Sequence, residues 1–254
     1  MTRQKNTAYM LRQWLIPAIA VLIVAVFLIS QLLQGNYLSV AVVVALVALA
    51  AAWTLYGPAR QERKLLQSAA PEPLLAHYER TFAQAPIADR DAALAFHKAV
   101  ALTLYGRYDD ARAALAVIDW PARPPLIQAQ KTLLEAWWAY LAQPDPARGL
   151  RLAQQARELA DVSFPFPGAG QPLAAYAAAV DLGQLLTGAA QPDAAAPDLA
   201  ARLEDRLPRQ PLLLKALLAW GLVIYYQRSG PPAAAARLRQ TLQALAPHCA
   251  GLPM

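Results

Sequence analysis

Apolar residues run almost without interruption through the first quarter of the chain. No charged residue lies between Arg12 and Arg60, and this interval holds two apolar runs, 14–33 and 38–56, separated by a short polar sequence with a glycine. Each run has about 20 residues and, at ~1.5 Å per residue, reaches about 30 Å, the thickness of the hydrocarbon core of a bilayer. The pattern therefore predicts a transmembrane helical hairpin over residues 14–56.

Two other interpretations of these runs are weaker. Buried helices of a soluble core rarely contain apolar runs of this length. The apolar region of a cleaved signal peptide has only about 7–15 residues, and residues 30–34 offer no cleavage site flanked by small residues. Aromatic residues, which favour membrane–water boundaries, mark the predicted ends of both spans. These are Tyr9, Trp14, Tyr37, Trp53 and Tyr56.

Basic residues on both sides of the predicted hairpin indicate its orientation. Three precede the first run, three follow the second, and the turn between the runs has none. They are Arg3, Lys5, Arg12, Arg60, Arg63 and Lys64. Because basic flanks face the cytoplasm, both termini are expected there. A composition rich in Ala and Pro, with Arg favoured over Lys, indicates a GC-rich bacterium and hence its inner (plasma) membrane.

Beyond the hairpin, apolar positions recur at helical spacing, and no alternating strand pattern is present. Helices with one apolar face are predicted over 107–119, 147–161, 197–208 and 231–246. Helices that are apolar on most sides alternate with them and are predicted over 88–105, 125–142, 172–187 and 211–228. The sequence thus predicts an all-α chain with four parts. These are a basic N-terminus (1–13), the hairpin (14–56), a juxtamembrane helical linker (57–84) and a helical repeat domain (85–254).

The segment 211–226 has a single charged residue, Lys215, and is a candidate for a third transmembrane span. It would reach only about 24 Å, short of the ~30 Å hydrocarbon core, and a lysine held deep in the bilayer costs up to about 3 kcal/mol. We therefore expect a buried helix of the repeat domain, with a third span as the alternative.

Two of the predicted helical pairs resemble tetratricopeptide repeats, in which a glycine turn joins helix A to helix B. The similar residues are Ala99, Gly106, Tyr108, Ala111, Leu115 and Ile118 in the first unit and Gly230, Ala235, Leu242 and Pro247 in the last. The turns recur at a mean spacing of about 41 residues, within the range of helical solenoids. The resemblance implies an αα-solenoid that binds protein partners in a groove lined by its A helices.

Composition adds little chemistry to this picture. The chain is 57% hydrophobic and 16% charged with a net charge of +6, which excludes an intrinsically disordered protein, and its single cysteine excludes a disulfide framework. The histidines lack metal-ligand spacing, and acidic residues interleave with the arginines, unlike a phosphate-binding patch. We expect no catalytic, cofactor or metal site, no nucleic-acid partner and no small-molecule substrate.

One stripe of the predicted helix 125–142 is a candidate surface for binding a partner. Lys131, Glu135 and Trp138 follow one another at helical spacing, and a tryptophan beside charges is typical of binding hot spots. Lys98 and Lys215 occupy lone charged positions on neighbouring A helices. Together these residues predict a basic groove suited to an acidic peptide or a C-terminal carboxylate. The alternative is that Trp138 packs against the next hairpin and the lysines are ordinary solvated charges.

These observations favour a membrane-anchored helical-repeat adaptor that holds protein partners at the cytoplasmic face, with residues 14–56 in the lipid bilayer. One alternative is a structural subunit of a membrane complex that uses the hairpin as its interface. Another is an enzyme without a recognisable motif, which the lack of clustered His, Cys and carboxylate residues disfavours.

A reporter enzyme that is active only in the periplasm, fused after Met254, tests the predicted topology. Because the basic flanks place both ends of the hairpin in the cytoplasm, we expect background activity from this fusion. The same reporter inserted after Gly35, in the turn of the hairpin, is the control and should be active. High activity of the fusion at Met254 would contradict the two-span topology and favour a third span over 211–226.

Overall fold

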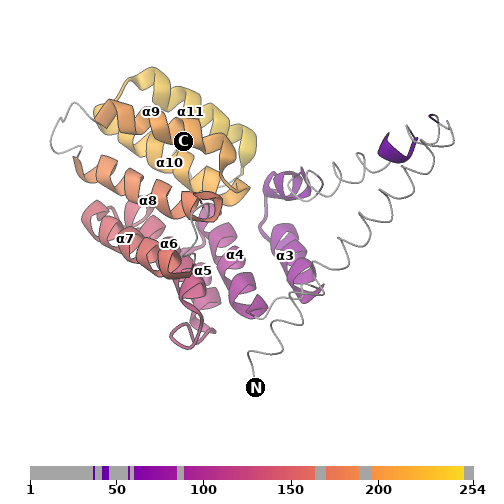
Figure 1. Ribbon diagram of the computed structural model, residues 1–254. Helices are drawn as coiled ribbons and strands as arrows, with labels where there is room; N and C mark the ends of the chain where they lie inside the picture. The colour runs from indigo at the N-terminus through magenta and orange to yellow at the C-terminus, as the bar shows by residue number, and fades with distance from the viewer. Residues whose placement is uncertain are drawn as a thin grey trace. The chain divides into compact units, whose positions relative to one another are not determined.

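The computed structural model describes most of the chain beyond residue 60 and a few residues before it (Figure 1). The described residues are 37, 42–45, 57, 60–84, 89–163, 170–188 and 196–248. The predicted transmembrane hairpin lies outside the described residues, apart from Tyr37 and 42–45, which are helical. No helix within the described ranges, α10 (Leu212–Ser229) included, is long and apolar enough to cross a membrane.

From Gln61 onward the described residues are arranged in helices joined by turns and loops, and no strand occurs among them. The elements are α3 (Glu72–Gln84), α4 (Arg90–Leu104), α5 (Tyr108–Ala116), α6 (Pro125–Leu141), α7 (Pro146–Ser163), α8 (Gly170–Gly188), α9 (Ala196–Arg206), the 3-10 helix η1 (Leu207–Arg209), α10 and α11 (Pro232–Leu245). The expected all-α class is confirmed. The helices predicted between residues 88 and 246 correspond one to one to α4–α11, with ends that agree within a few residues.

The turn between α4 and α5 shows how the sequence ends a helix. Gly106 has a φ of 72°, a left-handed conformation that glycine adopts without steric cost. Its N–H donates to Thr103 O at 3.0 Å, and the N–H of Arg107 donates to Leu102 O at 2.9 Å. These two bonds satisfy the last carbonyls of α4 and reverse the chain directly into α5.

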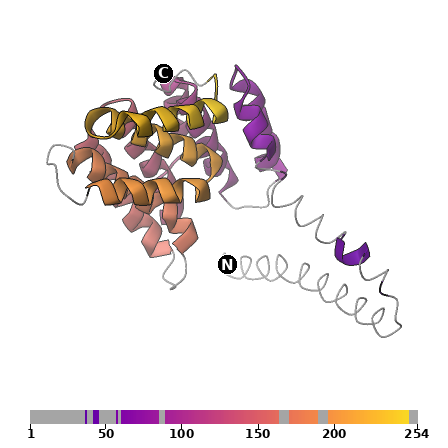
Figure 2. The same ribbon diagram turned by 90° about the horizontal axis from the view of Figure 1, so that it is seen from above.

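The apolar helices bury one another. α4 packs on α6, α6 on α8 and α8 on α10, and α10 also contacts α4 and α6. Each of the amphipathic helices α5, α7, α9 and α11 packs on the apolar helix that precedes it (Figure 2). Because α10 has neighbours on several sides, it needs apolar residues all round, and Leu217, Trp220 and Leu222 are at most 4% exposed.

The segment that precedes α4 shares this core. Leu66 is fully buried, and Tyr105, which follows directly after α4, donates its hydroxyl to Ser68 O at 2.8 Å. α3 packs on α4, and the hydroxyl of Tyr78 in α3 donates to the Glu62 carboxylate. Burial and then the negative charge of Glu62 raise the pKa of Tyr78, so its hydroxyl stays protonated and remains a donor. The juxtamembrane linker of the sequence analysis is therefore held against the helical domain over these residues.

Tyr140 of α6 fixes the contact between three helices. Its side chain is 3% exposed, and its hydroxyl donates to Ala179 O of α8 at 3.0 Å. A Cβ atom at Gly149 of α7 would lie 2.3 Å from Cε1 of Tyr140, and one at Gly183 of α8 would lie 2.2 Å from its Oη. The close approach of α7 and α8 to this ring therefore requires glycine at both positions.

The Gly183→Ala variant is expected to destabilise the protein by about 1–3 kcal/mol, because the added methyl group overlaps Tyr140 and forces a packed ring to move. Gly188→Ala, at the end of the same helix, is the control, since a Cβ there meets no atom within 4 Å. Adding Tyr140→Phe to Gly183→Ala should recover part of the loss, because it removes the closest atom. Urea unfolding followed by circular dichroism measures these differences. Equal stabilities of the two alanine variants would contradict the packing argument.

Candidate functional site

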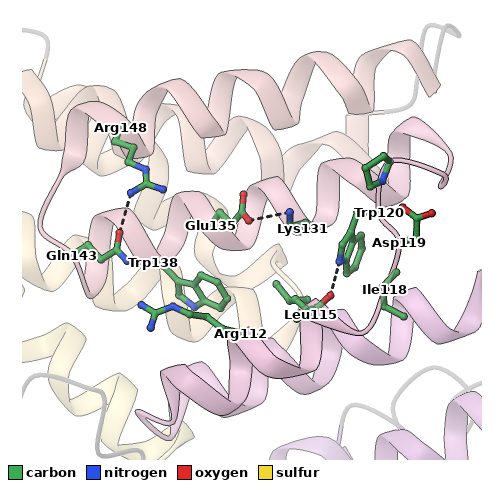
Figure 3. Close-up of a pocket in the computed structure, with 12 residues that line it drawn as sticks. Arg112, Leu115, Ile118, Asp119, Trp120, Lys131, Glu135, Trp138, Gln143 and Arg148 are labelled. Carbon is green, nitrogen blue, oxygen red and sulfur yellow. Dashed lines mark hydrogen bonds and ion pairs between the residues drawn. The ribbon is translucent and has the colours of Figure 1, made fainter.

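A cavity of about 500 Å³ lies between α5, α6 and the start of α7 (Figure 3). α5 and the loop after it contribute Arg112, Leu115, Ile118, Asp119 and Trp120 to its walls. α6 and the beginning of α7, with the turn between them, contribute Lys131, Glu135, Trp138, Gln143 and Arg148. We call the space bounded by these residues the α5–α6 groove. The stripe predicted as a binding surface on α6 forms one of its sides.

The groove exists because α5 is short. This helix has 9 residues against 17 in α6, and its main packing partner is α4 rather than α6. The chain then turns at Pro121, where the N–H of Arg123 donates to Trp120 O at 3.0 Å, and it is extended at Pro124 before α6 begins at Pro125. α5 and this loop cover α6 incompletely, and the uncovered part of α6 becomes a wall of the groove.

Trp138 is a buried wall of the groove, with 7% of its surface exposed. Its indole N–H donates to Thr103 Oγ1 of α4 at 2.8 Å, and the Thr103 hydroxyl donates in turn to Ala99 O at 2.7 Å. The guanidinium carbon of Arg112 lies 5.9 Å from the ring centre, in cation–π contact. Of the two alternatives for Trp138, the structure therefore favours packing against a hairpin over an exposed binding anchor. The hairpin is the preceding one rather than the next, because α4 and α5 cover the C-terminal end of the stripe.

Trp120 lines the groove on its other side, beyond Leu115 (Figure 3). Its side chain is 5% exposed, and its indole N–H donates to Leu115 O at 2.7 Å, which holds the loop against the end of α5. Ile118 lines the same side, and Leu115, Ala116 and Pro121 are the other apolar lining residues. We call these four residues, which accompany the two tryptophans, the apolar floor of the groove.

Charged side chains of both signs surround this floor. Lys131 and Glu135 form an ion pair at 3.3 Å on α6, and Arg112 pairs with Asp109 at 2.9 Å. Both pairs are partly exposed, so each contributes less than about 1 kcal/mol to stability, and their main effect is to orient the side chains. Arg148 lies within 3.4 Å of the side-chain oxygen of Gln143.

The structure places two of the predicted groove residues elsewhere. Lys98 forms an ion pair with Glu79 of α3 and does not line the groove. Lys215 is a half-buried residue of α10 and does not line it either. The reason is the contact of α10 with α4 and α6, which turns the apolar helices toward one another. Lys131, Glu135 and Trp138 are the predicted residues that the structure brings together.

The histidine at the centre of the α3–α4 contact has a packing role. Burial lowers the pKa of His97, which makes the ring neutral at neutral pH, and its Nδ1 lies 2.8 Å from Ala93 O. The rings of Tyr78, Phe82 and Phe96 lie 4.9–5.5 Å from it, centre to centre. In the part of the chain that the structure describes, no three His, Cys, Asp or Glu side chains are grouped to hold a metal ion.

Five polar or aromatic groove residues escaped the sequence reasoning, namely Arg112, Asp119, Trp120, Gln143 and Arg148. The arginine pattern around Arg148 is that of a solvated charged face, and the other four lie on a different predicted helix, in a loop or in a turn. One signal was available for Trp120, because a large aromatic ring beside prolines in a short loop is usually packed against a neighbouring element.

No family model, no curated protein and no solved structure matches the chain. The described residues by themselves define an all-α domain built from consecutive helical hairpins, with the α5–α6 groove at the side of α6. The tetratricopeptide resemblance rests on the residues of this chain alone and stays a prediction.

Thr103→Val tests whether the bond to Trp138 holds the groove wall. The valine removes the acceptor of a buried indole N–H. We therefore expect it to lower the free energy of unfolding by about 1–3 kcal/mol more than the same substitution at a matched threonine. Thr132→Val is that match, because the Thr132 hydroxyl also donates one turn back, to Gln128 O at 3.1 Å, without accepting an indole N–H. Urea unfolding of both variants measures the difference. Equal losses would mean that the bond to Trp138 contributes nothing to stability.

Proposed function

We propose that this chain is a membrane-anchored helical-repeat adaptor that binds a protein partner at the cytoplasmic face of a bacterial inner membrane. The α5–α6 groove, with its apolar floor and its charged margin, is the observation that carries the proposal. Buried aromatic side chains next to charged groups are the usual composition of a protein-binding pocket. The partner is received in the groove, and residues 14–56 hold the domain at the lipid bilayer.

The helical pairs support a tetratricopeptide-like scaffold. Ala99 of α4 and Ala111 of α5 are fully buried, as the small positions of that family's two helices require. Gly106 adopts the left-handed turn between them, and Ala235 of α11 is 5% exposed at the corresponding place in the last pair. The domain differs from an open solenoid in the position of α10. This helix contacts α4 and α6 and so occupies the space between the A helices. The binding surface is therefore assigned to the side of α6.

The membrane anchor is supported by the uncharged interval between Arg12 and Arg60. Where the structure describes that interval, three large apolar side chains are exposed, with 70% for Tyr37, 51% for Val42 and 50% for Val44, and Val43 is partly exposed. Exposed apolar side chains on a helix agree with a lipid environment. The basic residues on either side favour two spans with both termini in the cytoplasm.

Binding is favoured over catalysis by the chemistry of the groove. Its walls contain no His, Cys or Ser. Glu135 is engaged by Lys131, and Arg112 by Asp109 and by the ring of Trp138. None of these side chains forms the nucleophile–base or acid–base pair that a hydrolytic or transfer reaction needs. The groups present instead provide shape, apolar surface and charge.

Co-purification of the full-length protein from native membranes tests the proposal. We expect Arg148→Glu to lower the amount of recovered partner about tenfold, because it reverses a charge on the groove wall. Arg151→Glu is the matched control, since Arg151 is exposed one turn further along α7 and does not line the groove. Unchanged recovery with Arg148→Glu would contradict the role of the groove. If the partner then stays with a fragment of residues 1–60, the hairpin is the interface of a structural subunit.

A further inference from the structure

The unpaired charges of the α5–α6 groove have opposite signs. Among its charged lining residues, Lys131 is paired with Glu135 and Arg112 with Asp109. Arg148 and Asp119 are the two that form no ion pair with any described residue, and both are exposed. Figure 3 shows Arg148 on the side of Gln143 and Asp119 on the side of Trp120, with the floor between them.

The length of the groove along α6 sets the size of what fits between these charges. Lys131 and Trp138 both line the groove and are seven residues apart on α6, which corresponds to about 10 Å along the helix axis. An extended peptide covers this distance with about three residues. A ligand that spans the groove therefore has a few apolar residues over the floor and places its ends beside Arg148 and Asp119.

We propose that the groove selects a peptide segment whose apolar centre is flanked by acidic residues on one side and basic residues on the other. The acidic end lies at Arg148 and the basic end at Asp119. This inference rests on the proposed function and specifies its partner.

Charge complementarity favours this segment over segments that carry the same charge at both ends. A segment that is acidic at both ends would set one carboxylate against Asp119, and a segment that is basic at both ends would set a cation against Arg148. Like charges brought together at an interface cost free energy, and this repulsion is how specificity is commonly achieved.

Three labelled synthetic peptides with one common apolar centre test the proposal. Each has about eight residues, enough to cover the floor and extend past both ends. One carries two glutamates at one end and two lysines at the other, one carries glutamates at both ends, and one carries lysines at both ends. Fluorescence anisotropy with the full-length protein in phospholipid nanodiscs measures their affinities. We expect the mixed peptide to bind about tenfold more tightly than either of the others.

Charge reversal at each end gives the sharper test. Asp119→Lys should transfer the preference to the peptide with glutamates at both ends, and Arg148→Glu should transfer it to the peptide with lysines at both ends. Arg151→Glu should leave the preference unchanged, because Arg151 does not line the groove. All three residues are exposed, and a circular dichroism melt of each variant verifies that the fold is retained.

The outcomes separate this inference from the proposed function. Equal binding of the three peptides, stronger binding of a peptide with like charges, or no binding of any of them would overturn the inference. If Arg148→Glu nevertheless reduces co-purification of the natural partner, the groove is still the binding site and only the charge rule is wrong. If co-purification is also insensitive to Arg148→Glu, both proposals fail.

Discussion

The apolar surface of α10 needs cover on several sides, and α4, α6 and α8 provide it. This mutual burial is the constraint on which the rest of the domain depends, since each outer helix has one apolar face and finds its partner in this layer. The layer is tight as well as apolar. Tyr140 fits only because Gly149 and Gly183 lack side chains, and Gly221 of α10 similarly makes room for Leu182 of α8.

The groove follows from what the layer leaves uncovered. α7 runs along most of α6, whereas α5 is about half as long and is attached mainly to α4. The gap that results is bordered by two tryptophans whose N–H groups are already satisfied within the domain. A ligand would therefore contact the apolar faces of these rings and not their N–H groups. The charged side chains at the margin would orient it.

The sequence predicted the helices well because helical period, glycine turns and proline positions are local properties. Gly106 is an example, since its need for a positive φ can be inferred from the chain reversal alone. The groove was predicted only in part, because it depends on which helices meet. The spacing of Lys131, Glu135 and Trp138 on one helix is local and was enough to predict that they lie on one face. The hydrogen bond between Thr103 and Trp138 joins residues 35 positions apart and could not be predicted in this way. The same holds for Arg112, Trp120 and Arg148, which approach α6 from the stretches of chain before and after it. The hairpin lies outside the described residues and stays a prediction.

The end of α4 connects the groove to the juxtamembrane segment, residues 61–68, which precedes α3 and follows the predicted membrane anchor in the sequence. Thr103 accepts the indole N–H of Trp138, and two residues later Tyr105 donates to Ser68 O. Residues two positions apart on a helix point to nearly opposite sides, so α4 is clamped between the groove wall and the juxtamembrane segment. The fully buried Leu66 strengthens this attachment. A partner bound in the groove would thus be held at a fixed position relative to the juxtamembrane segment.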